Sequence, residues 1–204
     1  SGDLSNNRWR YSLGAQWDEI ADNAEWGIRL SLTYKFSNDR RLKLSHQSRR
    51  NKTRLEYTQD ANQRYVGAFS LRTGIEHNDQ NEALFDLNTQ YNGNRFLASL
   101  DHASFYEQLN ASSAYHQSRV SFASSVAFAE DDWAIGKPIY DSFALIKPHS
   151  SLKDKKITLG QYKDQYRANN ADFDTILLHD ISSYDNSAIS VDVEDLEPGY
   201  DIGA

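Results

Sequence analysis

Apolar and polar residues alternate along most of residues 1–129, and this spacing of two constrains the fold more than any other feature of the chain. Residues 9–17 read W-R-Y-S-L-G-A-Q-W, and residues 26–36 read W-G-I-R-L-S-L-T-Y-K-F. Successive side chains of a β-strand point to opposite faces, so each segment has one apolar and one polar face. Shorter alternating segments follow, separated by polar turn residues such as 37–39 and 78–81. The pattern predicts an all-β fold in which roughly nine strands form an antiparallel meander of hairpins.

Two details of this pattern lead to local predictions. Asn92-Gly93 stands between two alternating runs, and both residues tolerate positive φ, so the dipeptide predicts a tight hairpin turn. Residues 120–128 alternate through Val120, Phe122, Val126 and Phe128, which predicts one last strand of the meander.

The alternation fits two architectures. In a soluble sandwich the apolar faces fill a shared core, whereas in a transmembrane β-barrel they meet lipid and the polar faces line a wet lumen. The longer segments run about 9 to 12 residues, the length of a tilted membrane strand. No proline precedes Pro138, as expected where every backbone N–H must be paired. Aromatic residues fall near the segment ends, where membrane barrels carry interfacial girdles, at Trp9, Trp17, Trp26, Phe36, Tyr57, Tyr65, Tyr91, Phe96, Phe105, Tyr115 and Phe128.

Composition excludes several other classes. No stretch approaches the roughly 18 apolar residues of a membrane-spanning helix, and with Cys 0 a disulfide scaffold is impossible. The net charge is −7, and residues 133–204 are more acidic than the rest, which argues against nucleic acid as a partner. The chain has Met 0 and begins at Ser1 without the charged and apolar regions of a signal peptide, so we expect a piece of a longer protein.

A second domain is expected after the alternating part. All three prolines lie beyond residue 137, and short apolar runs at 143–146, 157–159, 175–178 and 188–191 are typical of strands in a small β-sandwich. We therefore divide the chain into residues 1–132, the strands of the meander, and residues 138–204, the sandwich, with Phe143 expected in the sandwich core.

Two motifs in this second part resemble a known family. The segment K-P-I-Y-D-S-F-A covers Lys137, Pro138, Ile139, Asp141, Ser142, Phe143 and Ala144, and the segment I-S-V-D-V-E-D-L covers Ile189, Val191, Asp192, Asp195 and Leu196. In this order, behind barrel-like hairpins, they resemble the outer-membrane ushers of chaperone–usher fimbrial assembly. The segment 162–170 departs from the Gly-rich loop that the family usually has between the two motifs.

The resemblance implies a fold, a location and a function. Residues 1–132 would be the last strands of a transmembrane β-barrel in the bacterial outer membrane, and residues 138–204 a periplasmic C-terminal β-sandwich. The fragment would take part in protein secretion and pilus assembly, with outer-membrane lipid, pilus subunits and periplasmic chaperone–subunit complexes as its partners. It would not be an enzyme and would need no cofactor, because donor-strand exchange releases folding energy held back by the chaperone. A passive porin-like barrel with a periplasmic appendage is the alternative, and a soluble carbohydrate-binding β-protein is a third.

No group of residues carries an enzyme motif. The six histidines (His46, His77, His102, His116, His149 and His179) are scattered, so no metal site is predicted, although two of them could meet across a hairpin. Asp172, Asp174, Asp180 and His179 are best interpreted as a solvated acidic face, and Glu194–Glu197 as a loop rather than a Ca²⁺ site. The Arg40-Arg41 and Arg49-Arg50 pairs fit hairpin ends, lumen-lining positions or sites near lipopolysaccharide.

Overall fold

Every regular element of the described chain, apart from two short 3-10 turns, is a β-strand. A computed structural model describes residues 2–20, 23–107, 114–152, 154–171, 173–184, 186 and 188–195. The 3-10 turns are η1 (Ser48–Arg50) and η2 (Ser150–Leu152). The described part of the chain has no helix long and apolar enough to cross a lipid bilayer. The predicted all-β fold class is therefore confirmed.

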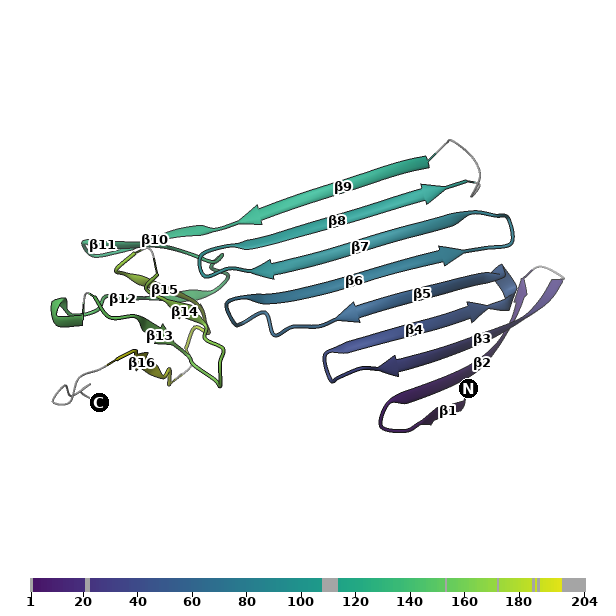
Figure 1. The fold of residues 1–204 in the computed structure, drawn as a ribbon. Coiled ribbons are helices and arrows are strands. Elements are labelled where there is room, and N and C mark those ends of the chain that lie inside the picture. Colours follow the sequence, from purple (N-terminus) through teal and green to yellow (C-terminus); the bar gives the residue numbers. More distant parts are fainter. Residues whose placement is uncertain are drawn as a thin grey trace. The chain divides into compact units, whose positions relative to one another are not determined.

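Nine strands form one large sheet in which each strand pairs with the next along the chain (Figure 1). They are β1 (Gly2–Ser5), β2 (Trp9–Ile20), β3 (Asn23–Lys35), β4 (Arg40–Gln47), β5 (Lys52–Gln59), β6 (Ala68–His77), β7 (Ala83–Asn92), β8 (Leu97–Tyr106) and β9 (Ala114–Ala123). The pairs from β1 to β6 are antiparallel, as expected for hairpins joined by short turns.

The register places apolar residues opposite one another. Leu13 pairs with Leu30, Leu44 with Leu55, and Leu55 with Ile75. Since a slip of one residue would turn every side chain to the other face, this matching pins the register across the sheet. Aromatic contacts reinforce it, because the ring centroids of Trp9 and Tyr34 lie 4.6 Å apart across the β2–β3 pair.

The hairpin between β7 and β8 forms at the predicted place but with a different turn. Gly93 N–H donates to Phe96 O at 2.9 Å, and neither Asn92 nor Gly93 has a positive φ. The predicted hairpin is therefore confirmed, but its turn does not use the positive φ that these two residues tolerate. Gly93 is instead required by close packing, because a Cβ there would lie 2.6 Å from the Phe96 ring.

The chain folds into two compact units. Unit 1 comprises Ser1–Ala61, Phe69–Gln90 and Ser99–Val120, and unit 2 comprises Asn62–Ala68, Tyr91–Ala98 and Ser121–Ala204. Strands β6, β7, β8 and β9 contribute residues to both units. Because the units are discontinuous in sequence, they do not test the division at residues 132–138, which stays a prediction.

Unit 2 contains three small sheets. They pair β10 (Ser125–Ala129) with β11 (Asp132–Gly136), pair β12 (Ser142–Ile146) with β15 (Ile176–Ile181), and place β13 (Ile157–Leu159) between β14 (Ala168–Asn169) and β16 (Val191–Val193). The single strand expected over residues 120–128 is thus two strands, β9 and β10, which belong to different sheets. The Ser124 hydroxyl between them donates to Arg95 O at 2.8 Å.

The core of unit 2 is built from the short apolar runs. Ile157, Leu159, Ala168, Ile176 and Leu178 form one buried cluster. A second cluster contains Ala127, Ala134 and Leu177. Phe143 lies outside both clusters and is 38% exposed, so its predicted place in the core is wrong. In the β12–β15 pair, Ala144 lies opposite Leu178 and Leu145 opposite Leu177.

Candidate functional site

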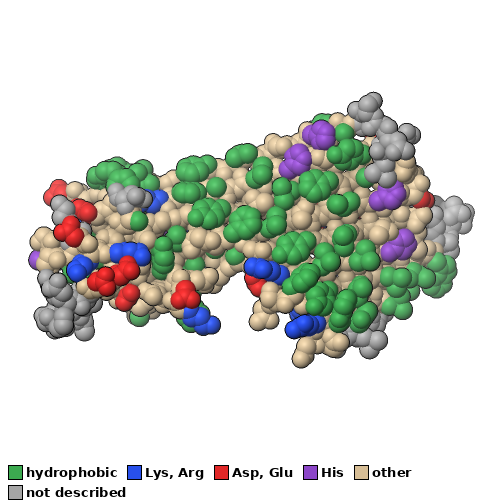
Figure 2. Space-filling view, viewed as in Figure 1, with side chains coloured by type: hydrophobic (Ala, Val, Ile, Leu, Met, Phe, Trp, Pro, Cys, Tyr) green, Lys and Arg blue, Asp and Glu red, His purple; other side chains and the backbone are tan. Residues whose placement is uncertain are grey.

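Unit 1 exposes large hydrophobic side chains on one face of its sheet, which we call the apolar face. Trp26 is 72% exposed and Leu30 48% exposed. The exposed members are Trp9, Tyr11, Leu13, Trp17, Trp26, Ile28, Leu30, Leu44, Leu55, Phe69 and Ile75. Figure 2 shows such hydrophobic side chains spread over the sheet. A soluble protein rarely exposes so large a contiguous apolar patch without a partner to cover it.

The opposite face carries charged residues in a network centred on Arg54. Its Nη1 lies 2.6 Å from an Asp86 carboxylate oxygen, and its Nη2 lies 3.2 Å from a Glu56 oxygen. Lys52 pairs with Glu76 at 2.5 Å on the same face. Gly74 makes room for the guanidinium, because a Cβ there would lie 2.4 Å from Arg54 Nη2. This face is therefore polar and mutually compensated, the arrangement expected of a wall that faces water.

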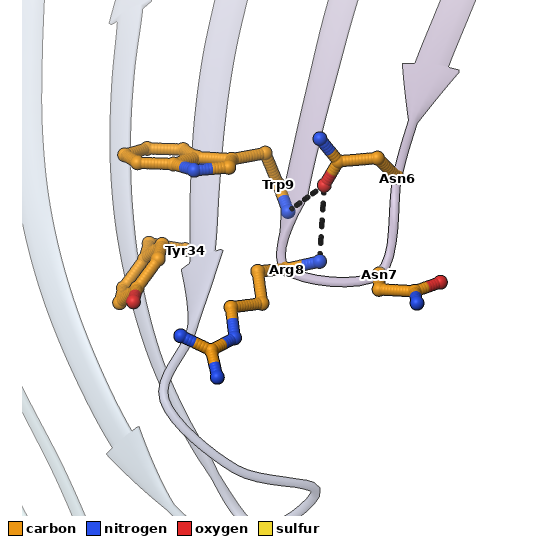
Figure 3. Close-up of a pocket in the computed structure, with 5 residues that line it drawn as sticks. All are labelled: Asn6, Asn7, Arg8, Trp9 and Tyr34. Atoms are coloured by element: carbon orange, nitrogen blue, oxygen red, sulfur yellow. Dashed lines mark hydrogen bonds between the residues drawn. The ribbon is translucent and has the colours of Figure 1, made fainter.

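An open hollow of about 710 Å³ lies at the β1–β2 turn (Figure 3). Asn6 shapes this turn, because its Oδ1 accepts hydrogen bonds from the backbone N–H groups of Arg8 (3.0 Å) and Trp9 (2.8 Å). Trp9 and Tyr34 form the aromatic side of the hollow, and Arg8 contributes a cation. Asn7 completes the lining, so the five lining residues are two asparagines, one arginine and two aromatic residues.

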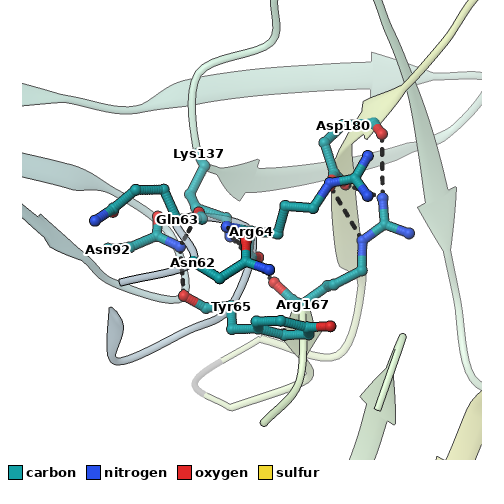
Figure 4. Close-up of polar contacts among 8 residues, drawn as sticks. All are labelled: Asn62, Gln63, Arg64, Tyr65, Asn92, Lys137, Arg167 and Asp180. Carbon is teal, nitrogen blue, oxygen red and sulfur yellow. Dashed lines mark hydrogen bonds and ion pairs between the residues drawn. The ribbon is translucent and has the colours of Figure 1, made fainter. Parts of the chain in front are cut away.

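Unit 2 contains a buried lysine, Lys137, from the first family motif. Only 1% of Lys137 is exposed, and its Nζ donates to Arg64 O at 3.3 Å and to Arg167 O at 3.2 Å (Figure 4). The ammonium thus ties the β5–β6 turn to the segment before β14. Burial removes the ammonium from water and lowers the pKa of Lys137 to about 8, and the nearby Asp180 carboxylate partly opposes this shift.

Beside Lys137 lies an ion pair between Arg167 and Asp180. The Arg167 Nε donates to the Asp180 carboxylate at 3.1 Å, and its Nη2 also bonds that carboxylate. Arg64 approaches the same carboxylate at 3.7 Å. Asp180 is therefore a paired, half-buried group, and the expected solvated acidic face does not include it. Burial, with Lys137 adding a like charge, lowers the pKa of the neighbouring His179 to about 4.

Asparagine side chains complete the polar contacts of unit 2. Asn92 is fully buried, and its Nδ2 donates to Gln63 O at 2.6 Å and to Tyr65 O at 2.5 Å. Asn94 exchanges hydrogen bonds with Asn169, donating at 2.6 Å to its side-chain oxygen and accepting at 3.1 Å from its backbone N–H. The Asn92 amide thus binds carbonyl oxygens of the β5–β6 turn, and the Asn94–Asn169 bonds join the β7–β8 turn to strand β14.

Other residues of the first motif form hydrogen bonds that fix strand β12 and the segment before it. The Asp141 carboxylate accepts bonds from the Ser183 N–H at 2.8 Å and hydroxyl at 2.5 Å, which lowers the pKa of Asp141. The Ser142 hydroxyl donates to Ile181 O at 2.8 Å. Pro138 is half-buried, directly after Lys137. The first motif therefore clamps β12 to the end of β15 and buries one lysine.

The second motif lies on and around the edge strand β16. Ile189 packs against the buried cluster of unit 2, whereas Val191 and Asp192 are exposed and pair with β13. The backbone oxygen of Asp195 accepts from Lys155 Nζ at 2.7 Å. Leu196 of this motif, like Asp172 of the acidic group, lies outside the described residues. The apolar run at 188–191 becomes strand only from Val191 onward.

Histidines and arginines occupy ordinary positions in the sheets and turns. His102 and His116 are brought together, with ring centroids 6.2 Å apart, but within the described residues no group of three or more potential ligands could hold a metal ion. Arg41 pairs with Asp60, and Arg40 lies 3.7 Å from Asp39. Arg49 and Arg50 end the turn η1. Both arginine pairs thus occupy hairpin ends.

Sequence reasoning missed the groups around Lys137. Arg167 stands in a segment with no recognisable motif, and the Asn-Gly pattern predicts Asn92 only as a turn residue. No spacing rule links residues 63–65, 92, 137 and 167, because their contacts come from chain segments far apart in sequence. The signal that was present is the lysine before Pro138 in an otherwise apolar context.

Comparison with known proteins adds no assignment. No family model, curated protein or solved structure matches this chain.

Proposed function

We propose that the chain is part of an outer-membrane fimbrial usher, in which the nine-stranded sheet forms part of the wall of a transmembrane β-barrel and unit 2 is a periplasmic β-sandwich that binds chaperone–subunit complexes. The observation that carries this proposal is the exposed apolar face of unit 1 opposite a compensated polar face. A sheet with one face toward acyl chains and one toward a wet lumen requires this division.

The soluble alternative has less support. In a soluble sandwich, residues such as Leu30 and Ile75 would be buried beneath a second sheet, yet they are about half exposed. The lengths of β2 and β3, 12 and 13 residues, exceed the roughly 9–11 residues that a tilted strand needs to cross a bilayer.

Unit 2 offers an edge for strand addition. Strand β16 lies at one side of its three-stranded sheet, and among the described residues β13 is the only strand paired with it. Val191 on this strand is 45% exposed. An extended segment of a partner can add to such an edge, taking affinity from backbone hydrogen bonds and specificity from exposed side chains. This role uses no catalytic group and no cofactor.

The test is the binding of a purified fimbrial chaperone–subunit complex to the full chain in detergent, measured by co-elution and by titration. We expect binding, and we expect Val191→Asp to weaken it at least about tenfold, since a charge would enter the contact. Val126→Asp is the matched control, because Val126, on β10 of the same unit, is 54% exposed and so at least as accessible as Val191. A chain that enters bilayers but binds no such complex would instead be the porin-like barrel.

A further inference from the structure

Four histidines accompany the apolar face of unit 1. His46 lies on β4 and His77 on β6, and both pair with Thr53 of β5, so the three residues form one row across the sheet. His102 on β8 lies 6.1 Å from Phe85 of β7 between ring centroids, and it stacks on His116 of β9. Figure 2 shows histidine side chains among the hydrophobic ones on one face.

The β6–β7 hairpin shows that the apolar face continues from β6 onto β7. The Asn78 N–H donates to Glu82 O at 3.2 Å, and continuing this antiparallel register places Ile75 opposite Phe85. Phe85 and His102 therefore lie on the face that carries Leu44, Leu55 and Ile75. His46 is the last residue but one of β4, His77 is the last residue of β6, His102 lies in the second half of β8, and His116 lies near the start of β9, so the four histidines lie toward the same end of successive strands.

We propose that these four histidines form a headgroup-binding belt, which contacts the phosphates of anionic lipids and strengthens the membrane contact of the apolar face when the pH falls. This inference rests on the proposed contact of that face with lipid. It adds the chemical class of the lipid, an anionic headgroup, and the control of the contact by pH. Lipid is the occupant because the imidazoles adjoin exposed hydrophobic side chains, which a free phosphate ion would leave uncovered.

Each imidazole has partners that tolerate a second proton. His77 Nδ1 bonds the Glu82 carbonyl oxygen at 3.0 Å. A carbonyl only accepts, so Nδ1 carries the proton and Nε2 is the position that gains the next one. His46 Nδ1 bonds the Thr53 hydroxyl at 2.9 Å, which accepts or donates as required. Protonation therefore breaks no contact of the sheet.

The pair on β8 and β9 shares one hydroxyl. His102 Nε2 and His116 Nδ1 each lie 2.8 Å from the Ser104 hydroxyl, and His102 Nδ1 lies 2.7 Å from the Ser118 hydroxyl. The two lone pairs of one oxygen can accept both N–H groups. Two imidazolium rings 6.2 Å apart then repel each other, and an anionic phosphate placed beside them offsets that repulsion.

Few fixed charges compete for these histidines. The Glu82 carboxylate near His77 is bound by Asn78 Nδ2 at 2.7 Å. The neighbours of His46 on β3 and β5 are Leu30 and Thr53. Tyr106 contacts His116 edge-on. Asp86, Asp101 and Arg119 line a hollow together with His102, but each is next in sequence to a residue of the apolar face (Phe85, His102 and Ser118), so their side chains lie on the opposite face of the sheet.

The test is co-flotation of the full chain with vesicles of phosphatidylcholine alone or mixed with phosphatidylglycerol, at about pH 5.5 and 7.5, the range in which histidine changes charge. We expect binding to the anionic vesicles to be at least about fivefold stronger at the lower pH, with a loss of this gain at high salt. Phosphatidylcholine vesicles are expected to show no such gain.

The decisive variant replaces all four histidines by glutamine, His46→Gln, His77→Gln, His102→Gln and His116→Gln, since glutamine keeps a donor and an acceptor without titrating. We expect it to bind as the wild type does at about pH 7.5 and to lose the gain at about pH 5.5. His149→Gln, in unit 2, is the control and should keep the gain. Two double variants, one for each histidine pair, serve if the quadruple variant misfolds, and each should lose part of the gain.

The outcomes separate this inference from the proposed function. A pH gain that persists in the histidine variants, or that is absent from the wild type while vesicles still bind, overturns the headgroup-binding belt alone. Failure of the wild type to bind any vesicle at either pH removes the lipid contact of the apolar face and both proposals with it.

Discussion

The two units use the same β-strands but give their apolar side chains opposite environments. In unit 1 the large hydrophobic residues of β2–β6 remain exposed, as with Trp26 at 72%, whereas in unit 2 Leu178 is fully buried. The strands differ accordingly, because β2 and β3 alternate along their length while β13 and the start of β15 bury consecutive residues. Alternation thus marks strands with one apolar and one polar face, and short continuous apolar runs mark strands covered on both faces.

The two units also differ in how their charged side chains are paired. Unit 1 compensates Arg54 with carboxylates on its polar face, where water still reaches the groups. Unit 2 buries one lysine whose ammonium is bound by two carbonyl oxygens. A buried charge held by neutral acceptors is costly, so the folding of unit 2 is coupled to pH.

Replacing a core leucine tests the contrast most strongly. Leu178→Ala should lower the free energy of unfolding of unit 2 by about 2–5 kcal/mol, because it removes buried methyl groups and leaves a cavity. Hydrogen exchange of the β13 and β15 amides in the full chain measures the loss. Leu44→Ala in unit 1 is the matched control and should cost less than about 1 kcal/mol in water. Equal losses at the two positions would contradict the difference in burial.

A charge on the apolar face tests which solvent that face meets. Leu32→Arg, on the same face and paired with Tyr11 and Leu44, should destabilise the bilayer-inserted chain by about 2–4 kcal/mol if the position lies near the membrane midplane, since arginine must leave water for acyl chains. Denaturant titration in lipid vesicles measures the change. Thr33→Arg lies on the opposite face of β3 and should have little effect. If the Thr33→Arg variant lost more stability than the variant on the apolar face, the face that carries Thr33 would be the one in contact with lipid.

The pH dependence of unit 2 tests its buried lysine. The pKa of Lys137 is lowered from 10.5 to about 8 in the folded chain, so the folded state binds this proton less readily than the unfolded state does. The cost of burying the charge is absent above pH 10.5, grows as the pH falls to about 8, and is constant below that. The free energy of unfolding should therefore rise by about 3 kcal/mol from the lower to the higher pH.

Hydrogen exchange in unit 2, corrected for its intrinsic pH dependence, follows this rise. Lys137→Met keeps most of the side-chain volume and cannot titrate, so its profile should be flat over the same range. A rise that survives in the Lys137→Met variant would assign the effect to other groups.

The sequence predicted the fold class and most strands because alternation is a local property. Residues 9–17 and 26–36 lie within strands β2 and β3, and three of the four apolar runs of the second part became strands largely as expected. The break at Ser124 was not predictable, since residues 120–128 alternate on both sides of it. Phe143 was misplaced because hydrophobicity alone does not say which side of a strand meets a core.

The candidate sites were predictable only in part. The motif around Lys137 could be recognised, but its contacts with residues 64 and 167 depend on segments that approach only in the folded chain. The histidines of unit 1 look scattered in sequence, and pairing of the strands brings them to one face.

What the sequence determined by itself is the two-sided character of each strand, because the period of side-chain direction is set by the backbone of a single strand. What only the tertiary structure decided is the environment of each side: exposed in unit 1, closed into a core in unit 2, with a lysine held by the carbonyls of two distant turns. Burial is a property of neighbours, and neighbours distant in sequence are specified by the folded chain as a whole.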